Sequence, residues 1–137
     1  MVKGIGIDLV DKLRFDKLIK KYGNKIAIKI LSTDEHHEYE ESKCKSSYLS
    51  KKFAAKEALS KALGCGLYRS GVYPKSISIK HTQLGKPFFE FSDSLLNLVD
   101  KNYTNIELSI SDTCSQSIAF VVIESWAILK TILVIHH

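Results

Sequence analysis

Apolar side chains occupy every second position at the start of the chain. Ile5, Ile7 and Leu9 share one side of an extended segment, while the other side carries glycines and Asp8. A period of two is typical of a β-strand with one buried face. We therefore predict a half-buried strand over residues 2–9.

Helical patterns follow in the first half of the chain. A first helix is predicted to begin after an N-cap at Asp11 and to run to about Lys21. Ser32 followed by Glu35 forms a capping-box pattern for a second helix. A third helix is predicted over residues 48–63, because small and apolar residues recur there at helical spacing. Its apolar face comprises Ala54, Ala55, Ala58, Leu59, Ala62 and Leu63.

The second half of the chain is mostly extended. Residues 76–80 and 87–91 are predicted to form a hairpin, and residues 106–111 and 117–124 a second antiparallel pair. A short helix is expected to start at Ser92. Helices and antiparallel strands in separate blocks favour an α+β fold, with packed helices on an antiparallel sheet in a single small domain.

Composition adds a hint about partners. The 137 residues suffice for one domain with its own core, and 20 Lys and Arg exceed 15 Asp and Glu, for a net charge of +5. This excess leaves open a nucleic acid, a phosphorylated cofactor or an acidic protein. Aromatic and basic residues are not interleaved as in single-strand nucleic-acid platforms, which argues against nucleic acid.

The cysteines and the C-terminal segment bear on location. Cys44, Cys65 and Cys114 are odd in number and form no C-x-x-C pair, which favours a reducing compartment, and no secretory signal opens the chain, so we expect a cytoplasmic protein. Residues 126–135 are mostly apolar, but they are about half as long as the roughly 20 residues of a membrane span. Residues 125–137 are therefore predicted to be an apolar C-terminal extension that packs on the protein or on a neighbouring copy.

Three features could carry chemistry or binding. Asp8 ends a glycine-lined strand side where a ligand can approach and a carboxylate can hold a cation, although an exposed acid closing an edge strand explains the pattern as simply. Glu57 and Lys61 lie one helical turn apart. This spacing usually means a solvated ion pair, and the alternative is a metal-binding carboxylate beside a phosphate-binding ammonium.

The third feature is a basic face on the first predicted helix. Arg14, Lys17 and Lys21 share this face, and Asp16 is the only acid between positions 12 and 29. A solvated face is the common explanation, but charge of one sign favours docking of an acidic partner.

Taken together, several segments resemble the holo-(acyl-carrier-protein) synthases of the 4′-phosphopantetheinyl transferase superfamily. The resemblance covers roughly residues 2–124. The stretches that carry it are residues 4–10 (GIGIDLV), 30–32 (ILS) with Glu35, 53–64 (FAAKEALSKALG), 85–87 (GKP), 109–111 (SIS) and 119–124 (AFVVIE).

The resemblance implies the fold of that superfamily and a magnesium-dependent enzyme. Such an enzyme moves 4′-phosphopantetheine from coenzyme A to a serine of apo-acyl carrier protein, for fatty acid biosynthesis, and releases adenosine 3′,5′-bisphosphate. It implies that Asp8 and Glu57 are the Mg²⁺ ligands, that Glu57 or a metal-bound water accepts the serine proton, and that Lys61 neutralises phosphate charge.

The resemblance also implies partners. Lys52, Gly64 and Lys86 become further contacts to coenzyme A, and the face of Arg14, Lys17 and Lys21 becomes the docking surface for the acidic carrier. Members of the family are typically homotrimers with coenzyme A between protomers, so each site would use residues of two chains.

One position varies within the family, and two other functions stay open. Many relatives have histidine where this chain has Asp112, so no histidine role is carried over. A transferase that serves a polyketide or peptide carrier is one alternative. A non-catalytic basic binding module is the other, and it leaves the pairing of Asp8 with Glu57 unexplained.

Overall fold

The computed structural model describes residues 1–100 and 105–125, so the C-terminal extension predicted for residues 125–137 lies outside the described residues apart from Ser125. The elements, in chain order, are β1 (Val2–Asp11), α1 (Lys12–Tyr22), α2 (Lys25–Ile30), α3 (Thr33–Glu41), α4 (Lys45–Ala62), the 3₁₀ turn η1 (Pro74–Ser76), β2 (Ile77–His81), β3 (Pro87–Phe91), α5 (Asp93–Asp100), β4 (Asn105–Asp112) and β5 (Gln116–Glu124). The α+β prediction is confirmed. The short helix α2 was not predicted, and α4 begins at Lys45, three residues before the predicted start.

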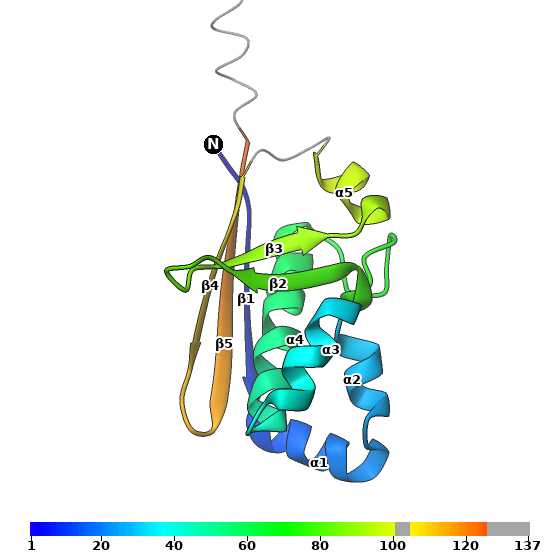
Figure 1. The fold of residues 1–137 in the computed structure, drawn as a ribbon. Helices are drawn as coiled ribbons and strands as arrows, with labels where there is room; N and C mark the ends of the chain where they lie inside the picture. Colours follow the sequence, from blue (N-terminus) through cyan, green and yellow to red (C-terminus); the bar gives the residue numbers. More distant parts are fainter. Residues whose placement is uncertain (101–104, 126–137) are drawn as a thin grey trace, which may run out of the picture.

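Two antiparallel sheets organise the fold. One has the strand order β1-β5-β4, and the other is the predicted hairpin of β2 and β3. Helix α4 runs along the three-stranded sheet, and α1, α2 and α3 gather around the side of α4 away from that sheet (Figure 1). The predicted apolar face of α4 is confirmed, since Ala54, Ala55, Ala58 and Leu59 have no exposed surface.

Glycines bring β1 against α4. A Cβ atom on Gly6 would lie 1.8 Å from the Ala58 carbonyl oxygen, and one on Gly4 would lie 2.0 Å from that of Ala62. Only glycine allows the strand and the helix backbone to approach so closely. The strand is half-buried as predicted, but its buried side is the one that carries the glycines and Asp8.

The opposite side of β1 is correspondingly exposed. Ile5, Ile7 and Leu9 expose 62%, 54% and 57% of their surface. On the neighbouring strand β5, Phe120 is the register partner of Ile7 and exposes 43%. The outer face of the three-stranded sheet therefore carries an apolar patch, which we call the outer-face patch (Ile5, Ile7, Leu9 and Phe120).

The two predicted helix starts differ in outcome. The capping box of Ser32 and Glu35 at the start of α3 is confirmed. Asp11 precedes α1 as predicted, but its side chain caps no helical N–H. Its Oδ1 instead accepts a hydrogen bond from Nε2 of Gln116 at 3.1 Å, which joins β1 to the start of β5.

A buried ion pair that the sequence did not reveal ties α3 and β2 to α4. Lys56 Nζ donates to Glu35 Oε1 at 2.6 Å, to Ile30 O at 2.7 Å and to Pro74 O at 3.0 Å. Glu35 Oε2 accepts from the N–H of Ile79 at 3.0 Å. Burial lowers the pKa of Lys56 to about 8. Because both partners are buried and hydrogen-bonded, this pair fixes the helix that carries Glu57.

Candidate active site

Asp8 and Lys61 meet where β1 crosses α4. Lys61 Nζ lies 3.1 Å from Asp8 Oδ1 and donates to the Ile7 carbonyl oxygen at 2.9 Å. The side chain of Asp8 is only 14% exposed, whereas that of Lys61 is 52% exposed. Among the described residues, Lys61 therefore forms its ion pair with Asp8. The solvated ion pair with Glu57, which the helical spacing favoured, does not form.

The second oxygen of Asp8 is left without a partner. Asp8 Oδ2 is buried and has no hydrogen-bond partner among the described residues. A buried carboxylate oxygen without a partner is costly, and such atoms often mark the place of an ion or a bound group. A cation at this point would satisfy it.

Glu57 adds a second carboxylate to the same place. Burial raises the pKa of Glu57, and the negative charge of Asp8 raises it further, while Lys61 and Arg14 act in the opposite direction. Two carboxylates that disfavour each other's charge gain from a shared cation. We call Asp8, Glu57 and Lys61 the Asp8–Glu57 site.

The donor set fits magnesium. Among the described residues, no group of three or more His, Cys, Asp or Glu side chains could hold a metal. The carboxylates of Asp8 and Glu57 interact electrostatically at this place. Mg²⁺ is usually bound by one or two carboxylates, together with waters and substrate phosphates. The residues present therefore fit the predicted ion.

The predicted coenzyme A contacts fall into two groups. Gly64 follows α4, three residues after Lys61, and its positive φ of 78° favours glycine. Lys52 lies elsewhere, in a pocket of about 320 Å³ whose lining includes neither Asp8 nor Glu57. We call it the Lys52 pocket, and the other lining residues used below are Glu38, Tyr48, Lys51, His81 and Asp112.

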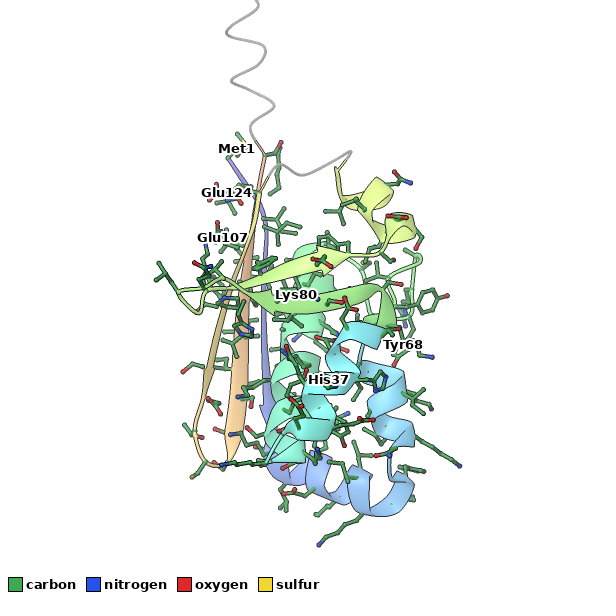
Figure 2. All side chains as sticks on the ribbon, in the orientation of Figure 1. Met1, His37, Tyr68, Lys80, Glu107 and Glu124 are labelled. Atoms are coloured by element: carbon green, nitrogen blue, oxygen red, sulfur yellow. The ribbon has the colours of Figure 1, made fainter. Side chains whose placement is uncertain are left out.

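The Lys52 pocket holds a largely buried cation. Lys52 Nζ lies 4.0 Å from Glu38 Oε2 and 4.9 Å from the centroid of the Tyr48 ring. Burial lowers the pKa of Lys52. Lys86 sits beside this pocket in the β2–β3 turn, between two lining residues, and its Nζ pairs with Glu107 Oε2 at 2.7 Å (Glu107 is labelled on β4 in Figure 2).

The basic face of α1 borders a groove. Arg14, Lys17 and Lys21 line it together with Asp11 and the apolar side chains of Leu13 and Leu18. We call this the α1 groove. The Arg14 guanidinium carbon lies 5.3 Å from the centroid of the Phe53 ring on α4, and its charge acts on Glu57. The groove therefore runs toward the Asp8–Glu57 site.

The sequence did not indicate that Lys51 and His81 line a pocket together with Lys52, and it gave Asp112 no role. The adjacent lysines at 51 and 52 were the only signal of a cationic pocket, since the other lining residues come from distant segments. Asp112 proves to line the Lys52 pocket from the end of β4.

Comparison with known proteins finds similar proteins over most of this chain. The family model of the 4′-phosphopantetheinyl transferase superfamily matches residues 4–121. The holo-(acyl-carrier-protein) synthase of Nitrosospira multiformis is 43% identical over 125 residues, which cover 90% of this chain and 99% of the relative.

Solved structures show the same architecture. The crystal structure of the holo-(acyl-carrier-protein) synthase of Neisseria meningitidis is 39% identical, with a TM-score of 0.87, and the match covers 91% of this chain and all of that chain. The corresponding protein of Helicobacter pylori, solved in complex with coenzyme A, is 31% identical with a TM-score of 0.75, over 88% of this chain and 99% of that chain.

Proposed function

Since this chain belongs to the 4′-phosphopantetheinyl transferase superfamily, we propose that it transfers 4′-phosphopantetheine from coenzyme A to a serine of an apo-acyl carrier protein. The reaction yields holo-acyl carrier protein and adenosine 3′,5′-bisphosphate, in support of fatty acid biosynthesis. The observation that carries the proposal is the meeting of Asp8, Glu57 and Lys61, with one buried carboxylate oxygen lacking a partner among the described residues. Relatives that are named for this activity and match this chain over nearly their whole length support it.

Asp8 and Glu57 would hold the magnesium ion. Their carboxylates come to the same place from β1 and α4, and Asp8 Oδ2 needs a partner there. When bound, the ion would neutralise charge on the pyrophosphate of coenzyme A and on the departing nucleotide. Lys61, anchored on the Ile7 carbonyl, offers its half-exposed ammonium to the same phosphates.

Glu57 would accept the proton of the attacking serine. The serine oxygen forms a bond to the phosphorus next to pantetheine, and the bond from that phosphorus to the bridging oxygen breaks. Adenosine 3′,5′-bisphosphate leaves with the electron pair, and the hydroxyl proton passes to the Glu57 carboxylate. A general base must lie within hydrogen-bond reach of the proton that it accepts, and the family resemblance implies that Glu57, or a metal-bound water beside it, takes this role.

A neighbouring copy would complete the coenzyme A site. The Lys52 pocket and Lys86 lie apart from the Asp8–Glu57 site within one chain, and the outer-face patch leaves apolar side chains uncovered. Soluble proteins seldom expose such a patch unless it contacts a partner. A homotrimer that buries the patch would let the Lys52 pocket of one protomer serve the Asp8–Glu57 site of the next.

The carrier would dock on α1. Carrier proteins of this kind are acidic, and the α1 groove pairs three cations with the apolar side chains of Leu13 and Leu18. The cytoplasm is the proposed compartment, and the three free cysteines fit a reducing one. None of the helices in the described ranges has the length and apolar character of a membrane span.

A mass assay tests the proposal. The protein is incubated with coenzyme A, Mg²⁺ and an apo-acyl carrier protein, and the carrier should gain one phosphopantetheine group on its serine. No gain would contradict transferase activity and favour a basic binding module. A panel of fatty-acid, polyketide and peptide carriers then separates the proposed carrier class from the alternatives.

A further inference from the structure

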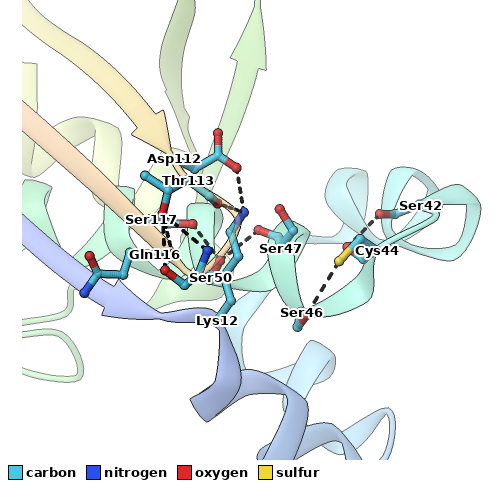
Figure 3. A network of polar contacts seen from close by, with 11 residues as sticks. Lys12, Ser42, Cys44, Ser46, Ser47, Ser50, Asp112, Thr113, Gln116 and Ser117 are labelled. Atoms are coloured by element: carbon cyan, nitrogen blue, oxygen red, sulfur yellow. Dashed lines mark hydrogen bonds and ion pairs between the residues drawn. The ribbon is translucent and has the colours of Figure 1, made fainter.

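The start of α1 is bound to the turn between β4 and β5. Lys12 Nζ lies 2.7 Å from Asp112 Oδ2 and 2.6 Å from the Thr113 carbonyl oxygen (Figure 3). The backbone N–H of Lys12 also donates to the Ser115 carbonyl oxygen at 2.8 Å. The Lys12 side chain is only 11% exposed, so this ammonium faces the turn and not the solvent or the α1 groove.

Asp112 connects this contact to the Lys52 pocket. Its carboxylate pairs with Lys12, and the same residue lines the pocket. The charged groups that line the pocket are Lys51, Lys52, Glu38 and Asp112. His81 adds no charge near neutral pH, because burial lowers its pKa below the ordinary value.

The balance of these charges depends on Lys12. Two lysines and two carboxylates in the lining cancel, so the lining by itself has no net attraction for an anion. The ammonium of Lys12, in contact with Asp112, neutralises one carboxylate and leaves a net positive charge. At separations of several ångström in a partly buried pocket, one charge has a large effect on the binding of a phosphate.

We propose that Lys12 is a positioning residue for coenzyme A. Through its ion pair with Asp112 it leaves the Lys52 pocket with the net positive charge that receives the phosphates of coenzyme A. This inference rests on the proposed function, in which that pocket is part of the coenzyme A site. It gives a role in coenzyme A binding to Asp112, which stands where many relatives have histidine.

Three variants separate this electrostatic role from a merely structural one. Lys12→Met leaves Asp112 unpaired beside the ligand, so KM for coenzyme A should rise about tenfold, while kcat and KM for the carrier stay near wild type. Asp112→Asn removes the negative charge and leaves Lys12 in place, so KM for coenzyme A should fall. Lys12→Met combined with Asp112→Asn restores the wild-type charge balance, so KM should return close to wild type.

A structural clamp predicts a different pattern. If Lys12 only held the turn, the double variant would be at least as impaired as Lys12→Met, because neither retains the ion pair. That result, or an unchanged KM in Lys12→Met, would overturn the inference. If Lys12→Met does not fold, Asp112→Asn decides alone, and a KM that does not fall overturns it.

Controls distinguish failure of this inference from failure of the proposed function. Lys29→Met removes an exposed lysine from α2 and should leave KM for coenzyme A unchanged, which excludes an effect of overall net charge. Melting temperatures report folding of each variant. Wild-type protein that transfers nothing refutes the proposed function, whereas active wild-type protein with unaltered Lys12→Met refutes only the role of Lys12.

Discussion

At the scale of single residues, Asp8 occupies an environment that suits a metal ligand better than a structural acid. One of its oxygens pairs with Lys61, and the other is buried with no partner in the described part of the chain. Glu57 stands close enough for the Asp8 charge to raise its pKa. A site built for folding alone would not retain this repulsion, because neighbouring carboxylates that disfavour each other's charge lower stability.

We expect Asp8→Asn and Glu57→Gln to reduce transfer by at least about a hundredfold, because each removes a proposed ligand charge, and Glu57→Gln also removes the base. Asp8→Asn should lose the binding of Mn²⁺, which serves as a probe ion and is measured by titration calorimetry. The melting temperature of metal-free protein should not fall, since the repulsion between the carboxylates disappears.

Asp34→Asn is the matched control. Asp34 also pairs with a lysine, at 3.0 Å from Lys80 Nζ, but on an exposed part of α3. It should keep both transfer and Mn²⁺ binding. Near-normal turnover in Asp8→Asn or Glu57→Gln would refute the assignment of that residue.

Gly6 illustrates how a residue without a side chain can place a functional one. Gly6→Ala would set a methyl group 1.8 Å from the Ala58 carbonyl oxygen, so strand and helix must separate. Overpacking of this kind costs about 1–3 kcal/mol or more in the free energy of unfolding, which denaturant titration measures. Transfer should fall as well, because Asp8 moves relative to Glu57.

The matched change is Gly66→Ala. A Cβ atom at Gly66 would meet only the flexible side chain of Arg69, at an ordinary 3.5 Å. Its stability should stay close to that of wild type. Equal stability of Gly6→Ala and wild type would show that the close approach of β1 and α4 is not required.

At the scale of elements, α1 presents mostly basic side chains beside apolar ones along the α1 groove. Reversal of Arg14 and Lys21 to glutamate should raise KM for the carrier strongly and leave KM for coenzyme A nearly unchanged, because these residues line the α1 groove and not the Lys52 pocket. In wild-type protein, KM for the carrier should rise with salt, since exposed charges are screened over roughly 8–10 Å at physiological ionic strength.

Reversal of Lys25 and Lys29, which are exposed on α2, provides the same change in net charge away from the groove. Steady-state kinetics with both substrates compares the two double variants. An equal rise of KM for the carrier in both would mean that overall charge, and not the α1 groove, attracts the carrier.

At the scale of the whole molecule, the outer-face patch determines the proposed assembly. Ile7→Lys should convert the trimer to a monomer, as measured by light scattering, because it puts a charge into the proposed interface. The isolated chain should still fold, since Ile7 is 54% exposed within it. Ile28→Lys, at a similarly exposed position on α2, should leave the trimer intact. A wild-type monomer, or an unchanged trimer of Ile7→Lys, would contradict this interface.

Local patterns of apolar and polar residues predicted much of the fold. Alternation in β1, the capping box of α3, the β2–β3 hairpin and the apolar face of α4 depend on residues close in sequence, so the sequence alone predicted them. The motifs of the family resemblance also pointed to Asp8, Glu57 and Lys61, which the fold then brings to one place. The C-terminal extension stays a prediction, because residues 126–137 lie outside the described ranges.

Tertiary structure decided which residues meet. The alternating pattern does not determine which side of β1 is buried. The side with Asp8 is buried because the backbone of β1 approaches α4 closely at Gly6. The contacts of Lys56 with Glu35 and of Lys12 with Asp112 join positions 21 and 100 residues apart, and no local period encodes such pairs. Packing of distant segments also put Lys52 in a pocket separate from Asp8. The sequence by itself thus determined most of the elements, although not α2, and the chemistry available. Only the packing of those elements determined which charges face one another.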